Sequence, residues 1–113
     1  MQVQVTQQEW KLSEIWDRAS RELTQVKGRF GDTEKKEVCA LGAILFYLSN
    51  GTVCNRYEAL QQGREIGDYW LMKEYSSLVD LFYCKTGKKI ADLNDDEGWT
   101  FENFAERARE LGL

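Results

Sequence analysis

The sequence predicts an all-α fold, a compact bundle of about five helices around a buried central helix at about residues 36–48. The stretch 37–48 is nearly all apolar, and it is too short to cross a membrane, which takes about 20 such residues. A helix that is apolar on every side has to be enclosed by others. The 113 residues match the usual size of one domain, so we expect a single helical domain over residues 1–113.

The N-terminal part is expected to hold a short extended segment and then a helix. Residues 1–5 alternate apolar and polar side chains, which fits an extended lead-in or an edge strand that pairs with a partner chain. Thr6 and Glu9 form a capping box, and Val5 and Trp10 stand at the positions of a hydrophobic staple. The helix should run to about residue 26 with one apolar stripe, made of Leu12, Ile15, Trp16, Ala19, Leu23 and Val26.

The central helix has candidate caps and one residue that is unusual in a helix. Asp32 or Thr33 can cap it, and Glu34 and Glu37 favour its N-terminal turn. Gly42 is unusual because glycine costs about 1 kcal/mol relative to alanine in mid-helix. We interpret Gly42 as a point of close contact with another helix backbone, and a ligand approaching it is the alternative. The packing of this helix is assigned to Cys39, Leu41 and Gly42.

Helix-start and helix-stop residues mark the elements of the C-terminal half. Asn55 opens a third, shorter helix, and Asp68 caps a fourth over about 69–85 that Gly87 ends. A short helical turn is expected at 89–93. The inward stripe of the fourth helix is expected to hold Leu71, Tyr75, Leu78 and Phe82. Thr100 caps the last helix, whose stripe is Phe101, Phe104, Ala105, Ala108 and Leu111.

The composition excludes several classes of chemistry. The chain has no histidine, and its three cysteines are Cys39, Cys54 and Cys84. Without histidine, Ser-His-Asp and Cys-His catalysis and His-ligated metal sites are impossible within the chain, and three scattered cysteines cannot form a four-cysteine zinc site. An odd number of cysteines favours reduced thiols. Because no signal peptide or membrane span is recognisable, we expect a soluble, cytoplasmic protein. We also expect no cofactor.

The charge is placed unevenly along the chain. The net charge is −4, and residues 90–113 carry seven acidic and only two basic side chains. Residues 1–50 are balanced, with seven of each sign, and residues 51–89 carry six basic and five acidic side chains. A polyanion such as DNA or RNA needs cations to neutralise its phosphates, so direct nucleic-acid binding is disfavoured.

Two stretches taken together resemble a known family of small proteins. Residues 39–42 have the pattern Cys-x-Leu-Gly, and residues 93–95 read Leu-Asn-Asp, followed by Gly-x-Thr-Phe at 98–101. The Lys-Gly-Arg-Phe-Gly turn at 27–31 fits the same arrangement. This combination resembles small uncharacterised proteins of phages, prophages and bacterial genomes. That family has no established activity, so the resemblance implies a phage or mobile-element origin and no mechanism.

The loop after residue 92 has the partial spacing of a calcium site. Asp92, Asn94 and Asp96 alternate as the first ligands of an EF-hand loop do. The pattern fails at its sixth position, where Glu97 stands instead of glycine, and at its twelfth, which is Asn103. We therefore predict no metal site. The structural interpretation is a helix end and a new helix start, made by backbone bonds of Asn94 and Asp95 and the permissive φ of Gly98.

The same loop and the last helix form a candidate interaction patch. Carboxylates crowd around one tryptophan, and aromatic residues amid charge are common interface anchors. The alternative is a solvated face with the tryptophan folded back onto the core. The residues of the candidate patch are Asp92, Asp95, Asp96, Glu97, Trp99, Glu102 and Glu106.

Catalytic residues are hard to place in this sequence. Cys39 could be a nucleophile near the positive end of its helix, but its neighbours are apolar and no histidine can act as base. We interpret Cys39 as a buried structural thiol, and Cys54 and Cys84 in the same way. Acidic residues abound, yet no spacing selects a pair for glycoside or phosphate chemistry. We therefore predict no catalytic residue and expect that the protein is not an enzyme.

The hypothesis that follows is a small acidic binding protein that docks on a basic surface of a host protein. Clustered carboxylates can imitate phosphates and steer association, which would suit an inhibitor of a nuclease or of a defence complex, an anti-CRISPR-type role. The alternatives are a small-molecule or nucleotide-binding helical module, an enzyme that uses carboxylates and Cys39, and self-association as a homodimer. No membrane partner is expected.

Overall fold

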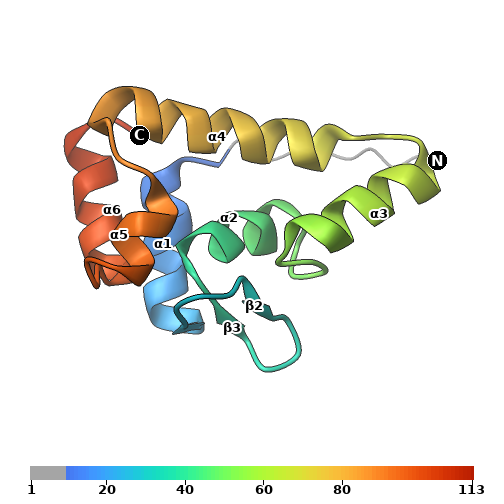
Figure 1. Cartoon of the computed structure of the whole chain (residues 1–113), viewed down its shortest axis with the longest axis horizontal. Helices are drawn as coiled ribbons and strands as arrows, with labels where there is room; N and C mark the ends of the chain where they lie inside the picture. The colour runs from blue at the N-terminus through green and yellow to red at the C-terminus, as the bar shows by residue number, and fades with distance from the viewer. Residues whose placement is uncertain (1–9) are drawn as a thin grey trace.

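The predicted all-α class is confirmed by the computed structural model, which describes residues 10–113 (Figure 1). A very small three-stranded sheet accompanies the helices. The helices are α1 (Leu12–Glu22), α2 (Ala40–Leu48), α3 (Arg56–Ile66), α4 (Trp70–Thr86), α5 (Ile90–Asp95) and α6 (Phe101–Glu110). The strands are β1 (Thr24–Gln25), β2 (Gly31–Asp32) and β3 (Glu37–Val38).

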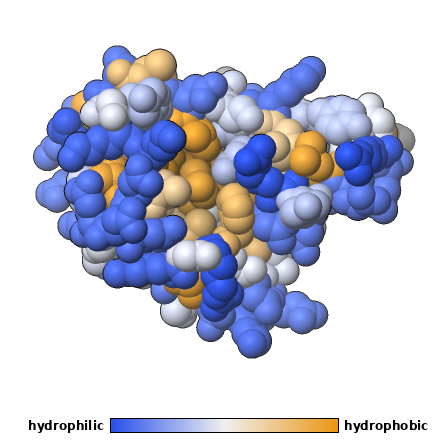
Figure 2. All heavy atoms as spheres, in the orientation of Figure 1, coloured by the Kyte–Doolittle hydropathy of each residue, from blue (hydrophilic) through white to orange (hydrophobic). Residues whose placement is uncertain are grey.

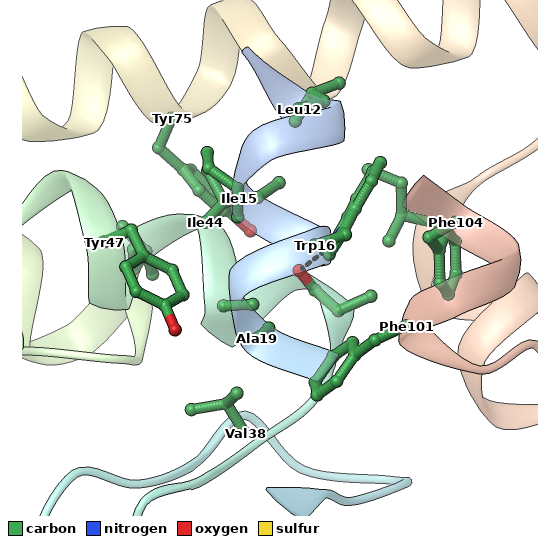
Figure 3. Close-up of a cluster of buried hydrophobic side chains, with 14 of the residues drawn as sticks. Leu12, Ile15, Trp16, Ala19, Val38, Ile44, Tyr47, Tyr75, Phe101 and Phe104 are labelled. Carbon is green, nitrogen blue, oxygen red and sulfur yellow. Dashed lines mark hydrogen bonds between the residues drawn. The ribbon is translucent and has the colours of Figure 1, made fainter. Parts of the chain in front are cut away.

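Helix α2 lies at the centre, as its apolar sequence predicts. Each of its side chains is buried or half-buried, and it contacts α1, α4, α5 and β3. Helix α1 packs between α2 and α6, while the long helix α4 crosses above them (Figures 1 and 3). The antiparallel hairpin of α3 and α4 extends away from this centre (Figure 1). The helices therefore enclose α2 without forming a regular parallel bundle.

Trp16 is the largest side chain of the core, and all of it is buried. Its ring meets Phe82 of α4 at 5.6 Å and Phe104 of α6 at 4.8 Å between ring centroids. Its indole Nε1 donates a 3.0 Å hydrogen bond to the Ala40 carbonyl oxygen at the start of α2 (Figure 3). The buried N–H thus has a partner, and one residue joins four helices.

The expected start of the central helix near residue 36 is wrong, because Glu37–Val38 form a strand and α2 begins at Ala40. β3 pairs with β1 in parallel and with β2 in antiparallel orientation. Lys36 has a φ of 56°, a left-handed conformation that a right-handed helix cannot include. The helix cap is accordingly Cys39, whose Sγ accepts a hydrogen bond of 3.3 Å from the Gly42 N–H.

The sheet also corrects the expected caps and the end of the first helix. Asp32 does not cap a helix; its Oδ1 accepts from the Glu34 N–H at 2.9 Å in the turn between β2 and β3. Thr33, Glu34 and Glu37 likewise lie outside any helix. Helix α1 ends at Glu22, four residues early, because the next residues pair with β3. The predictions on residues 1–9, including the capping box and the staple, lie outside the described residues.

The predicted caps of the later helices are confirmed. The Asn55 side chain accepts from the Glu58 N–H at 2.9 Å. The exception is Asp68: the N-cap of α4 is Tyr69, which makes no side-chain cap, and Asp68 lies one residue earlier, where its side chain accepts from the Trp70 N–H at 2.9 Å. Thr100 and Asn103 form a reciprocal capping box at the start of α6. Gly87 ends α4 with a φ of 70°. These ends were recognisable because capping depends on neighbours in the sequence.

Gly42 makes the close backbone approach that its position suggests, but the neighbour is not a helix. A Cβ at this position would overlap the carbonyl oxygen of Phe30 and lie 3.1 Å from that of Cys54. The Phe30 carbonyl also accepts a hydrogen bond of 2.9 Å from the Cys39 N–H, so it cannot move freely. Glycine is required here because two loop carbonyls press against α2.

Replacing Gly42 by alanine should lower the free energy of unfolding by about 1–3 kcal/mol, because overpacking against fixed backbone outweighs the better helix propensity. Urea denaturation of Gly42→Ala measures this. Ser77→Ala, at an exposed position in the middle of α4, is the control and should stay within about 0.5 kcal/mol of the wild type. Equal stability of the two variants would contradict the close approach.

Within residues 10–113, no helix has the length and apolar character that crossing a bilayer requires.

Candidate functional site

The buried side chain of Asn94 joins segments that are far apart in the sequence. It is 1% exposed. Its Oδ1 accepts from the Gln25 Nε2 at 2.8 Å and from the Ala40 N–H at 3.1 Å. Its Nδ2 donates to the Val26 carbonyl at 3.0 Å and to the Asp95 carboxylate at 2.7 Å. One carboxamide thus ties α5 to the end of β1 and to the start of α2.

Gln25 extends this junction to the last helix. Besides Asn94, its Nε2 also reaches the Trp99 carbonyl oxygen at 2.7 Å. Its Oε1 accepts from the Phe101 N–H at 2.8 Å, an amide of the first turn of α6 that has no partner within the helix. We call Gln25 and Asn94, with the backbone groups they bind, the polar junction. It satisfies the first amides of both α2 and α6.

Two of the sequence motifs, the turn at 27–31 and the Leu-Asn-Asp segment at 93–95, meet beside the polar junction. Asp95 accepts a 2.9 Å hydrogen bond from the Gly28 N–H, so the turn at 27–31 meets the Leu-Asn-Asp segment. The prediction that Asn94 bonds to nearby backbone is wrong, since its backbone partners lie 54 and 68 residues away. Both of its polar atoms are occupied, and no group of side chains in residues 10–113 is arranged to hold a metal ion.

Replacing Asn94 by alanine should destabilise the protein by about 2–4 kcal/mol, because the buried Ala40 N–H and a partly buried N–H of Gln25 lose this acceptor. Thermal or urea unfolding measures the loss. Gln61→Ala, at an exposed position on α3, is the control and should change stability by no more than about 0.5 kcal/mol. A loss below about 1 kcal/mol for Asn94→Ala would show that the polar junction is dispensable.

The carboxylates of the candidate patch lie on the surface. α5 and α6 follow one another with only residues 96–100 between them, and they occupy the same end of the molecule (Figure 1). We call the exposed carboxylates of these elements the acidic patch, made of Asp92, Asp95, Asp96, Glu97, Glu102 and Glu106. The polar junction holds the start of α6 and the end of α5, and therefore fixes where these charges stand.

The chain's own cations neutralise little of the acidic patch. Within residues 10–113, Glu97 is its one member with an ion pair, to Lys88 at 4.0 Å. The Lys27 ammonium lies beside Gly98. The Asp95 carboxylate accepts hydrogen bonds from the Gly28 N–H and from the Asn94 side chain. The remaining four carboxylates have no ion pair in this part of the chain. Most carboxylates of the acidic patch are therefore free to pair with basic groups of another molecule.

Trp99 is anchored more firmly than the other patch residues. Its ring is half-buried and packs on Phe104 with 5.3 Å between centroids. The backbone N–H of Trp99 donates to the Leu93 carbonyl at 3.0 Å. Part of the ring therefore belongs to the core and part remains at the surface. The carboxylates, not the indole, are the fully exposed groups of this region.

The cysteines occupy two different environments. Cys39 and Cys54 are buried, whereas Cys84 is exposed on α4, so the prediction that all three are buried is wrong for Cys84. Burial raises the pKa of the Cys39 thiol, and it raises the pKa of Cys54 to about 11. A raised pKa keeps both thiols protonated at neutral pH, which makes them poor nucleophiles.

A thiol reagent such as DTNB at pH 8 should label one cysteine per native chain. At that pH a thiol with a pKa of about 11 is ionised in only about one molecule in a thousand. Cys84→Ser should leave no fast reaction until denaturant is added, while Cys39→Ser should leave the fast reaction intact. Two or three fast thiols in the native protein would contradict the burial of Cys39 and Cys54.

Comparison with known proteins gives no relative from which a role could be taken. No protein-family model matches the chain, and no significant match is found among curated proteins or among solved structures.

Proposed function

We propose that the protein is a small acidic binding protein, without catalytic activity, that docks through the acidic patch on a basic surface of another protein. The observation that carries the proposal is the row of exposed carboxylates on α5 and α6, of which Asp92, Asp96, Glu102 and Glu106 have no ion pair within residues 10–113. Exposed charges of one sign raise association rates with surfaces of the opposite sign.

The polar junction makes the acidic patch a better docking surface than a flexible acidic tail would be. The carboxylates stand on two helices whose first or last turns are fixed by partly buried hydrogen bonds. A preorganised surface loses less conformational entropy on binding than a mobile one. The acidic patch can therefore present its charges at fixed spacing, as the phosphates of a nucleic acid do.

The target we propose is a surface that normally receives nucleic acid, on a nuclease or on a defence complex of the host. Such surfaces carry the clustered lysines and arginines that neutralise phosphates. The sequence resemblance to small phage and prophage proteins supports this choice, because an inhibitor of anti-CRISPR type would suit a phage or mobile element. The protonated state of the buried thiols supports a role without covalent chemistry.

Reversing charge on the acidic patch should abolish partner binding. Asp96 and Glu102 are exposed and take no part in the polar junction, so changing both to lysine should leave the fold intact. Affinity capture from a bacterial lysate, followed by mass spectrometry and titration of the purified partner, measures the effect. We expect at least about tenfold weaker binding, a steep loss of affinity with added salt, and competition by nucleic acid.

The matched control changes the same charge elsewhere. Glu34 and Glu65 are exposed on the turn before β3 and on α3, away from α5 and α6, and Glu34→Lys with Glu65→Lys alters the net charge equally. This control should bind within about twofold of the wild type. Equal binding by all three proteins, or equal loss in both double variants, would refute the acidic patch as the docking surface.

A further inference from the structure

A groove of about 430 Å³ lies between α4 and α5, outside the acidic patch. Its walls are formed by one face of α4, including Val79 and Tyr83, and by Ile90 of α5. Figure 2 shows apolar side chains gathered in the hollow enclosed by α4, α5 and α2, with hydrophilic residues around it. The volume falls within the range of about 300–1,000 Å³ that small-molecule sites have.

Tyr75 lines this groove, and only 6% of the residue is exposed. It extends from α4 toward α2 (Figure 3). Its hydroxyl has no hydrogen-bond partner among residues 10–113, although no fully buried side-chain nitrogen or oxygen of the described part is left without one. The hydroxyl is therefore not fully buried, and it belongs to a residue that lines the groove. Burial raises the pKa of Tyr75 to about 12, so the group stays protonated and can donate.

The rim of the groove carries an excess of positive charge. Arg56, the first residue of α3, and Lys89, just before α5, both line it. Asp80 of α4 is the one carboxylate among its lining residues. None of these three side chains has an ion pair within residues 10–113. Arg56 also lies close enough to influence the ionisation of Tyr75, which places its charge near the phenol.

We propose that this groove is a binding site for a small organic anion with an apolar or aromatic body. The apolar body lies between Val79, Tyr83 and Ile90, while the anionic group accepts a hydrogen bond from the Tyr75 hydroxyl and pairs with Arg56 and Lys89. This arrangement gives the phenol the partner that residues 10–113 do not supply. A few convergent polar groups in an apolar groove are the usual composition of a ligand site.

The site is separate from the proposed docking function. Its charged groups belong to α3, α4 and the residue before α5, whereas the acidic patch uses the exposed carboxylates of α5, α6 and their loop. Asp80 disfavours a ligand with several negative charges, since like charges at close range repel each other. A monoanion such as a carboxylate therefore fits better than a nucleoside triphosphate.

The test compares two probes of the same shape, indole-3-acetate and the neutral indole-3-acetamide, by NMR titration of the labelled protein. We expect saturable shifts confined to the α4–α5 groove, with the carboxylate bound at least about fivefold more tightly than the amide. Arg56→Gln and Lys89→Gln should each reduce this preference, because each removes one of the two cations that pair with the carboxylate. Tyr75→Phe should weaken carboxylate binding by about threefold or more.

The control is Arg64→Gln, on the same helix as Arg56 but not among the lining residues of the groove. It should leave both affinities unchanged, and the unperturbed spectrum of each variant shows that it is folded. The proposal is overturned if neither probe gives saturable shifts, if the shifts map elsewhere, or if the acetate and the acetamide bind equally. Equal weakening by Arg64→Gln would also overturn it.

Discussion

The buried carboxamide of Asn94 is the interaction on which the arrangement of the C-terminal third depends. Amide groups that leave water need partners for both their donor and acceptor atoms, and Asn94 finds them on β1, α2 and α5. Helix α5 has only six residues, and a helix this short has little stability of its own. Its position is therefore set by the hydrogen bonds of the polar junction and by the burial of Ile90 and Leu93.

Two surfaces of different character follow from the placement of this one short helix. Asp92 and Asp95 stand on α5 and face solvent as part of the acidic patch, whereas Ile90, at its start, closes the groove against α4. Gln25 fixes the start of α6 by accepting a hydrogen bond from the Phe101 N–H. This contact sets the position of Glu102 and Glu106, which follow on the same helix and are exposed. The docking surface and the ligand groove that we propose thus share a single structural support.

The sequence predicted the features that depend on neighbouring residues, and it did not predict those that depend on contacts between distant segments. The apolar stretch of α2, the stripe of α6 and the caps at Asn55 and Thr100 depend on residues within one or two turns, so periodicity and capping rules predicted them. The two-residue strands have no such pattern, and Gln25 resembles any exposed glutamine until its partner 69 residues away is known. The acidic patch was recognisable from charge alone, but the groove requires Arg56, Tyr75 and Lys89 from three separate segments.

Native-state hydrogen exchange of the Ala40 and Phe101 amides tests the central role of the polar junction most directly. Both amides lie in the first turn of a helix, where N–H groups without a helical partner normally exchange fast. Because their acceptors are the buried side chain of Asn94 and the half-buried side chain of Gln25, we predict that both exchange as slowly as the slowest core amides, through global unfolding. Exchange as fast as that of the exposed first-turn amide of Glu102 would contradict the account.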